Sequence, residues 1–171
     1  MKSKADHGSA PGPAGERASP VCYADEADAA YMGQLSREEL VAALNELLEA
    51  ERAGVRVAEE TAAQLSDPGT RALMESIRRD ELKWCAMLTV AIQSLGEKPG
   101  SHTGAFYGKA MAIADLQARM AFLNRGQAWV VRKLEAMIPR VRECDIQDRL
   151  LAMLNAHREN IDRVEARLGA R

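Results

Sequence analysis

The strongest constraint on the fold is the spacing of apolar residues, which recur at steps of three and four in four separate stretches. Such spacing gathers the apolar side chains on one face of an α-helix. The predicted helices cover about residues 36–65, 70–95, 113–138 and 145–169. No convincing alternating strand pattern accompanies them. The sequence therefore predicts an all-α fold.

Local signals set the ends of these helices. "SREE" has the form of a capping box, in which Ser36 and Glu39 satisfy free amides of the first turn. "SDPGT" at 66–70 predicts a tight turn. "ECD" at 143–145 predicts another turn, with Asp145 as the N-cap of the fourth helix. Each short turn makes the two helices that it joins antiparallel neighbours.

The link between the two hairpins is longer than a turn requires. It covers residues 96–112 and contains four glycines and a proline. Seventeen extended residues reach about 56 Å at ~3.3 Å each, whereas a helix of about 27 residues is about 40 Å long. The sequence therefore predicts two antiparallel helical hairpins joined by a long crossover, together forming one bundle over residues 36–169. Residues 1–35 are expected to form a flexible or partly ordered tail.

Composition limits the partners and the compartment. The formal net charge is −2, from 23 basic and 25 acidic residues, so no nucleic-acid partner is expected. No apolar run reaches about 18 residues, so no membrane association is expected either. The cysteines Cys22, Cys85 and Cys144 are widely spaced. We interpret them as reduced thiols of a cytoplasmic protein, with the role of Cys22 left open.

Each apolar stripe contains one conspicuous polar residue. These are Glu51, Glu81, Gln127 and His157. Thirty residues separate the two members of each hairpin, and 76 residues separate the equivalent positions of the two hairpins. Their distances from the turns agree to within about one helical turn. The spacing therefore predicts that the four side chains meet at one level in the bundle core, where they must form a shared cluster.

The residues around these positions resemble the ferritin-like superfamily, in its rubrerythrin and bacterioferritin form. "LNELLEAERA" (44–53), "DELKW" (80–84) and "HREN" (157–160) are similar to three of its metal-binding helices. The opening "SPVCYADEADAAYMG" (19–33) resembles a bacterial branch of that superfamily with no assigned activity. The resemblance implies a four-helix bundle, with a di-iron centre built from two Glu residues and two Glu-x-x-His motifs.

Matched position by position, the chain departs from that motif. The resemblance assigns Glu51 and Glu81 to ligand positions, but Trp84 stands where the family has a histidine. Gln127 replaces a third-helix Glu, and the last Glu-x-x-His is replaced by His157 and Asn160. Tryptophan cannot act as a ligand, because its indole offers only an N–H donor. We therefore expect a degenerate di-iron centre without ferroxidase activity.

Two interpretations of the core remain. In the first, Glu51, Glu81, Gln127 and His157 form a metal-free polar network in a non-enzymatic bundle, with the His157 imidazolium between the two carboxylates. Asn160 and the Trp84 N–H would bridge it. In the alternative, Glu51, Glu81 and His157 bind one Fe, Mn or Zn ion in a redox or metal-storage protein. Gln127 and Asn160 are then the weaker ligand candidates. The sequence does not decide whether the protein is an enzyme, and it leaves a homodimer open.

Overall fold

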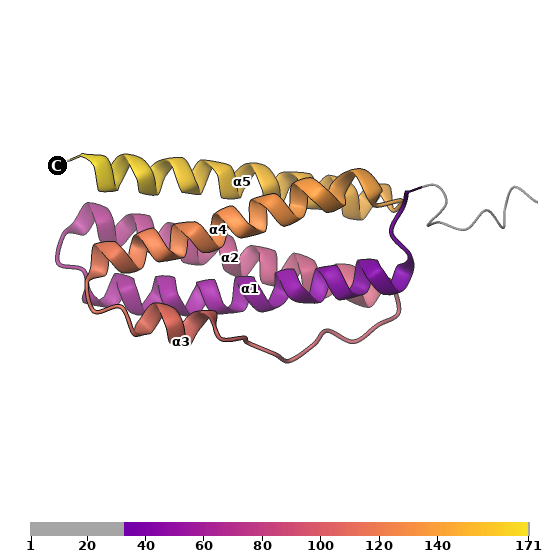
Figure 1. Cartoon of the computed structure of the whole chain (residues 1–171), viewed down its shortest axis with the longest axis horizontal. Coiled ribbons are helices and arrows are strands. Elements are labelled where there is room, and N and C mark those ends of the chain that lie inside the picture. Colours follow the sequence, from indigo (N-terminus) through magenta and orange to yellow (C-terminus); the bar gives the residue numbers. More distant parts are fainter. Residues whose placement is uncertain (1–32, 171) are drawn as a thin grey trace, which may run out of the picture.

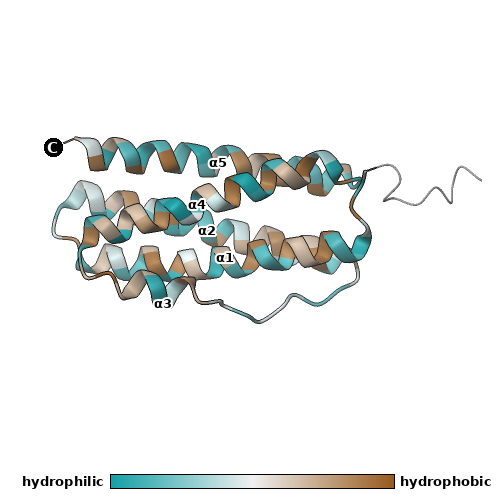
Figure 2. Ribbon diagram, in the orientation of Figure 1, coloured by the Kyte–Doolittle hydropathy of each residue, from teal (hydrophilic) through white to brown (hydrophobic). Residues whose placement is uncertain are grey.

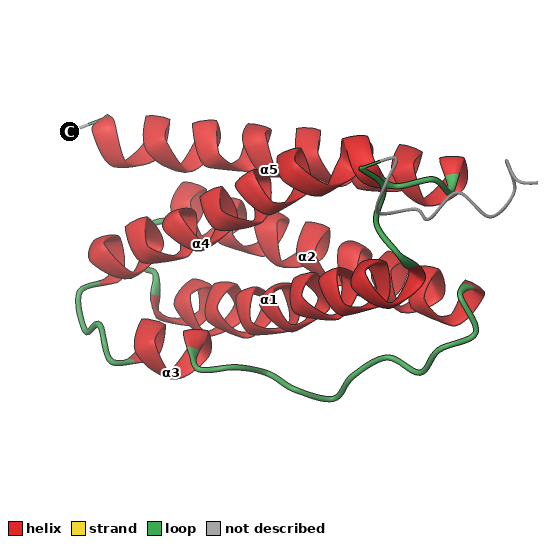
Figure 3. Ribbon diagram, turned by 45° about the vertical axis from the view of Figure 1, so that its right-hand side comes forward, coloured by secondary structure: helices red, strands yellow, loops and turns green. Residues whose placement is uncertain are grey.

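The computed structural model describes residues 33–170, and these are almost entirely helical (Figure 1). Its elements are α1 (Arg37–Gln64), α2 (Pro68–Ser94), α3 (Phe106–Met111), α4 (Leu116–Met137), the 3₁₀ turn η2 (Ile138–Arg140) and α5 (Cys144–Gly169). No strand occurs within this range (Figure 3). The predicted all-α class is therefore confirmed. The predicted tail, including Cys22, lies almost wholly outside the described residues.

The long helices pack as two hairpins. α1 lies antiparallel to α2, and α4 lies antiparallel to α5 (Figure 1). The hairpins meet through α1 against α4 and through α2 against α5. Consequently α1 and α5 are not neighbours but lie diagonally opposite each other, with the core between them. Within residues 33–170, no helix is both long enough and apolar enough to cross a membrane.

The segment between α2 and α4 runs back along α1, as Figures 1 and 3 show. The Gly100 amide donates to Asn45 Oδ1 of α1 at 2.7 Å. Arg52, also on α1, donates to the Gly100 carbonyl. This segment therefore returns the chain to the far end of the bundle before α4 begins, as its length predicts.

The helix α3 within this segment was not predicted. Its Phe106 ring stacks on Phe122 of α4, with centroids 4.9 Å apart. The hydroxyl of its Tyr107 donates to Glu60 of α1. Six residues are too few for a stable isolated helix, so these aromatic anchors on α1 and α4 account for it.

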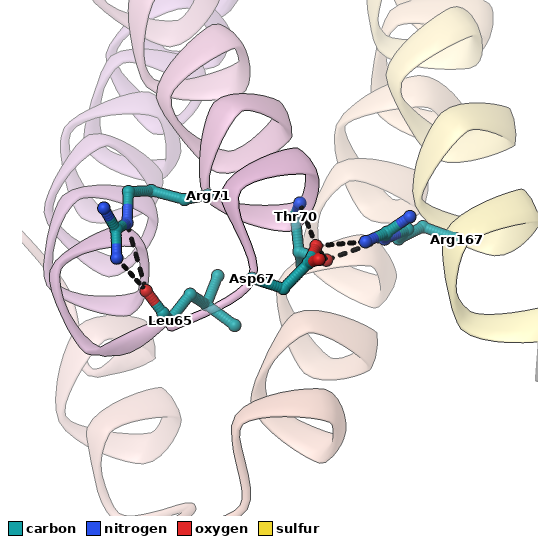
Figure 4. Close-up of polar contacts among 5 residues, drawn as sticks. All are labelled: Leu65, Asp67, Thr70, Arg71 and Arg167. Atoms are coloured by element: carbon teal, nitrogen blue, oxygen red, sulfur yellow. Dashed lines mark hydrogen bonds and ion pairs between the residues drawn. The ribbon is translucent and has the colours of Figure 1, made fainter.

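Side chains cap the first turns of α1 and α2, and the cap of α1 was predicted. The Glu39 amide donates to Ser36 Oγ at 3.2 Å, and the Ser36 amide donates to Glu39 Oε2 at 2.8 Å, which completes the capping box of α1. Asp67 is the N-cap of α2 and accepts from the Thr70 amide at 2.7 Å (Figure 4). Arg167 of α5 also donates to Asp67. The bonds from Thr70 and the Arg167 charge lower the pKa of Asp67 to about 2.

At α5 the predicted cap is wrong. The N-cap is Glu143, which makes no side-chain capping bond, and Asp145 lies inside the first turn. There Asp145 pairs with Arg149 at 3.0 Å. A carboxylate in the first turn still interacts favourably with the helix dipole, so the residue keeps an electrostatic role two positions further into the helix than expected.

The buried apolar residues form two clusters stacked along the bundle. One contains Leu48, Trp84, Val130 and Leu154, and the other contains Val57, Ile77, Leu123 and Val164, among others. Each long helix carries both apolar and polar residues along its length (Figure 2). On every long helix, the polar residue singled out by the sequence lies between the two clusters. We call Glu51, Glu81, Gln127 and His157 the polar layer.

Candidate functional site

The polar layer is buried and lines one cavity. Its members expose 2% (Glu51), 3% (Glu81), 3% (Gln127) and 1% (His157) of their surface. All four border a cavity of about 590 Å³. The prediction that these residues meet at one level of the core is therefore confirmed. One helix supplies each residue, so the site exists only when both hairpins are docked.

Within the polar layer, Glu51 and His157 form the one ion pair. His157 Nε2 lies 3.2 Å from Glu51 Oε1, across the core from α5 to α1. His157 Nδ1 lies 3.0 Å from the carbonyl oxygen of Met153. Because a carbonyl only accepts, Nδ1 carries a proton and Nε2 faces the carboxylate. Burial alone would lower the pKa of His157, but the Glu51 carboxylate and the Met153 carbonyl raise it above its usual value.

Glu81 occupies a notch in α1. A methyl group on the Cα atom of Gly54 would lie 2.6 Å from Glu81 Cδ and would overlap the carboxyl oxygens. Glu81 Oε2 has no hydrogen-bond partner among the described residues. Burial, followed by the charges of Glu51 and Asp80, raises the pKa of Glu81 well above its usual value. Its neutral acid form is therefore favoured.

Further polar atoms around the layer have no partner in the described part of the chain. They are Glu51 Oε2, both side-chain polar atoms of Gln127, and Trp84 Nε1. The predicted bridging by Gln127 and Trp84 is therefore wrong. A buried polar atom without a partner costs about 1–3 kcal/mol, so a polar cavity of this size must hold water or a ligand.

Asn160 is buried but directed elsewhere. Its Nδ2 atom donates to Asp80 Oδ2 at 3.1 Å, and its Oδ1 atom accepts from Arg163 at 3.1 Å. It does not border the cavity. The predicted bridging role of Asn160 is therefore wrong, because its amide is already satisfied by α2 and α5.

As they lie, the ionisable side chains in and near the cavity form neither a metal site nor a reactive thiol. Within residues 33–170, no group of three or more His, Cys, Asp or Glu side chains is placed to hold a metal ion. Cys85 is half-buried beside the layer. Burial, then the charges of Glu51 and Glu81, raises its pKa to about 12. The thiolate required for nucleophilic or redox chemistry is thus disfavoured there.

The cavity walls are mainly apolar and were not predicted. On α1 they consist of the small residues Ala50, Ala53 and Gly54, and on the other side of Phe106, Phe122 and Val130. The exposed segment Thr103–Ala105 lies at the mouth, as do Lys109 and Arg125. The small residues Ala50, Ala53 and Gly54 on either side of Glu51 were the sequence signal for this space. The arrangement offers a polar floor, apolar walls and an opening to solvent.

Small residues also set how close the crossover comes to the mouth. A Cβ on Gly126 of α4 would lie 2.6 Å from the Phe106 ring. Gly104 has a φ of +57°, which favours glycine, and a Cβ there would overlap Glu49 of α1. These glycines let α3 and the segment before it approach α1 and α4. The mouth is therefore bordered by a segment that is packed in place.

Comparison with known proteins identifies one relationship. Neither the curated proteins nor the solved structures gave a significant match. One family model, described as a domain of unknown function (DUF6306), matches residues 38–166. This range contains all four long helices except their outermost residues, and it includes the complete polar layer. Since the match covers well over half of the sequence, the chain belongs to the DUF6306 family.

Proposed function

We propose that this protein is a ferritin-like four-helix bundle with a degenerate di-iron centre that has no ferroxidase activity. The two antiparallel hairpins and the crossover along α1 support the architecture. The polar layer supports the location of the former centre, because its residues stand where the resembling superfamily keeps ligands. In this proposal, the core keeps a polar cavity instead of iron.

The residues around the cavity do not fit two iron ions. A di-iron centre of this type uses four carboxylates and two histidines. The polar layer has two carboxylates, one histidine and one neutral amide. Both ring nitrogens of His157 already face oxygen atoms, at 3.0 and 3.2 Å. The chain therefore supplies only two of the four carboxylates that such a centre uses.

One observation carries the proposal. The Trp84 side chain, at the position of a family histidine, is only 3% exposed and belongs to the apolar cluster with Leu88 and Val130. An indole cannot coordinate iron, and its bulk takes up space beside Glu81. The substitution therefore supports loss of the iron chemistry, rather than a change in its ligands.

The test is iron chemistry on the full chain. The protein is purified without chelator, its Fe, Mn and Zn contents are measured, and aerobic Fe(II) oxidation is followed with and without it. We expect no bound iron and no acceleration of oxidation. A burst of Fe(II) oxidation with two irons per chain would overturn the proposal. A quadruple variant with Trp84→His, Gln127→Glu, His157→Glu and Asn160→His should gain iron binding if the scaffold is ferritin-like.

A single metal ion bound by Glu51, Glu81 and His157 is the second candidate. It requires these side chains to move together, since no three such groups within residues 33–170 are placed to hold an ion as they lie. The 3.2 Å spacing of His157 Nε2 and Glu51 Oε1 suits two neighbouring ligands, since bonds of about 2.1 Å at 90–110° place ligands about 3.0–3.4 Å apart. Glu51 Oε2 and Glu81 Oε2 both lack partners within residues 33–170. About one Fe, Mn or Zn per chain, lost in His157→Ala, would support this candidate. Absence of metal after reconstitution would exclude it.

The compartment and assembly belong to the same proposal. A cytoplasmic location agrees with cysteines that are far apart in sequence and with the raised pKa of Cys85. Labelling of all thiols in protein extracted under non-reducing conditions tests it, because a disulfide would contradict the assignment. The homodimer stays a prediction, which the mass of the full chain in solution checks.

A further inference from the structure

The cavity combines features that favour a particular class of ligand. Its volume of about 590 Å³ lies within the range of small-molecule sites. Its floor carries two carboxyl groups, and its walls include the Phe106 and Phe122 rings. Glu51 Oε2 and Glu81 Oε2, which have no hydrogen-bond partner within residues 33–170, lie at the buried end of the cavity. An anion would be repelled from this floor, and a purely apolar molecule would leave its polar atoms unsatisfied.

The lining of the cavity narrows the class further. The walls beside the two carboxyl groups are apolar, with Ala50 and Ala53 on one side and the Phe106 and Phe122 rings on the other. A bare metal ion makes no favourable contact with alkyl walls. An organic cation places its charge on the carboxyl groups and its apolar body against these walls.

We propose that the cavity binds a small organic ammonium ion with an apolar body. The ammonium group donates to the carboxyl oxygens of Glu51 and Glu81 and to Gln127 Oε1. The body lies along Ala50 and Ala53 on one side and along the Phe106 and Phe122 rings on the other. Aromatic faces attract cations as well as apolar groups. This inference rests on the proposed function, because it requires a core free of iron.

The test is isothermal titration calorimetry on the full chain after treatment with EDTA and dialysis. The ligands are phenethylammonium, 2-phenylethanol and 3-phenylpropanoate, which differ mainly in charge. We expect the cation to bind at least about tenfold more tightly than the alcohol, as for a charge-assisted hydrogen bond, and the anion most weakly.

Two matched variants locate the effect. Glu81→Gln removes one carboxyl group from the floor with little change of shape, and it should lose the preference for the cation. Glu75→Gln, at an exposed position on the same helix, should keep that preference. The proposal is overturned if the alcohol binds as tightly as the amine, if Glu81→Gln keeps the preference, or if none of the three ligands binds.

The outcome separates this inference from the proposed function. If the chain does not oxidise Fe(II) and phenethylammonium does not bind, only the inference fails. If the chain binds two irons and oxidises Fe(II), both fail. If a divalent metal alone binds, the ammonium site is overturned and the single-metal candidate remains.

Discussion

The Glu81 carboxyl group lies so close to Gly54 that a methyl group on the Gly54 Cα atom would be 2.6 Å from Glu81 Cδ. The contact joins α2 to α1, one turn from Glu51. It fixes the position of a carboxyl group that otherwise has few partners. Glycine is required here by close approach, because α1 is regular helix at this position.

Gly54→Ala should destabilise the fold by about 1–2 kcal/mol, because Glu81 must leave its notch. The same substitution in a Glu81→Ala background should be neutral or stabilising by up to ~1 kcal/mol, since alanine is the better helix former. Urea unfolding of the four proteins of this double-mutant cycle measures the coupling. Gly108→Ala, where an added Cβ meets nothing within 4 Å, is the matched control. Equal effects in both backgrounds would contradict the contact.

Stability should fall as the pH rises above about 5. The pKa of folded Glu81 is raised above 4.5, so its stabilising contribution is complete below that pH and is lost as the pH rises through the folded value. The pKa of His157 is raised above 6.5, so its contribution is likewise lost at higher pH. Each proton changes the unfolding free energy by up to about 1.4 kcal/mol per pH unit.

Urea unfolding at pH 5, 6, 7 and 8 measures this slope. Glu81→Gln should flatten it and raise stability at pH 7, whereas Glu75→Gln should leave it unchanged. The window avoids Asp67, with its lowered pKa of about 2. The contribution of Asp67 is present above pH 3.8 and is lost only as the pH falls toward 2. Stability that increases from pH 5 to 7 would contradict the assignment of Glu81.

Cys85 should react far more slowly with Ellman's reagent than Cys144. With a pKa of about 12, Cys85 is thiolate at pH 8 in only about one molecule in 10⁴, and it is half-buried, whereas Cys144 is exposed. The measurement uses a Cys22→Ser background, so that two thiols remain. Adding Glu81→Gln should speed up Cys85, because that carboxyl group contributes to its raised pKa. Comparable rates for both thiols would show the assignment to be wrong.

Gln127→Leu should stabilise the fold by about 1–3 kcal/mol. Neither polar atom of the Gln127 side chain has a partner within residues 33–170, and the substitution joins two apolar clusters through Leu123 and Val130. Gln93→Leu, at an exposed position on α2, should change stability by less than about 0.5 kcal/mol. Thermal unfolding of both variants provides the comparison. A loss of stability in Gln127→Leu would mean that its amide is satisfied by a bound molecule.

The polar layer was predictable because helical periodicity fixes which residues share a face. Counting from the turns then places Glu51, Glu81, Gln127 and His157 at one height. The same periodicity does not orient side chains within the layer. Whether Glu81 contacts His157 or rests on Gly54 depends on the rotation and separation of the helices, which the periodicity does not specify. For the same reason, periodicity did not predict that the Asn160 amide donates to Asp80.

The helix α3 was missed because its stability comes from tertiary contacts. "AFYGKAM" at 105–111 has a helix-weakening glycine and no side-chain cap at its start. Its anchor Phe122 lies sixteen residues from Phe106, and its anchor Glu60 lies on another helix. Local rules correctly found the capping box at Ser36, because its bonds join residues only three apart.

The crossover between the hairpins contributes none of the four residues of the polar layer. Glu51 and Glu81 belong to the first hairpin, and Gln127 and His157 to the second. The crossover therefore sets the effective concentration of one hairpin for the other, while the packed faces supply the affinity. Two separate chains cut within residues 97–102 should accordingly reassemble the same core at sufficient concentration, with the cavity forming only in the heterodimer of fragments.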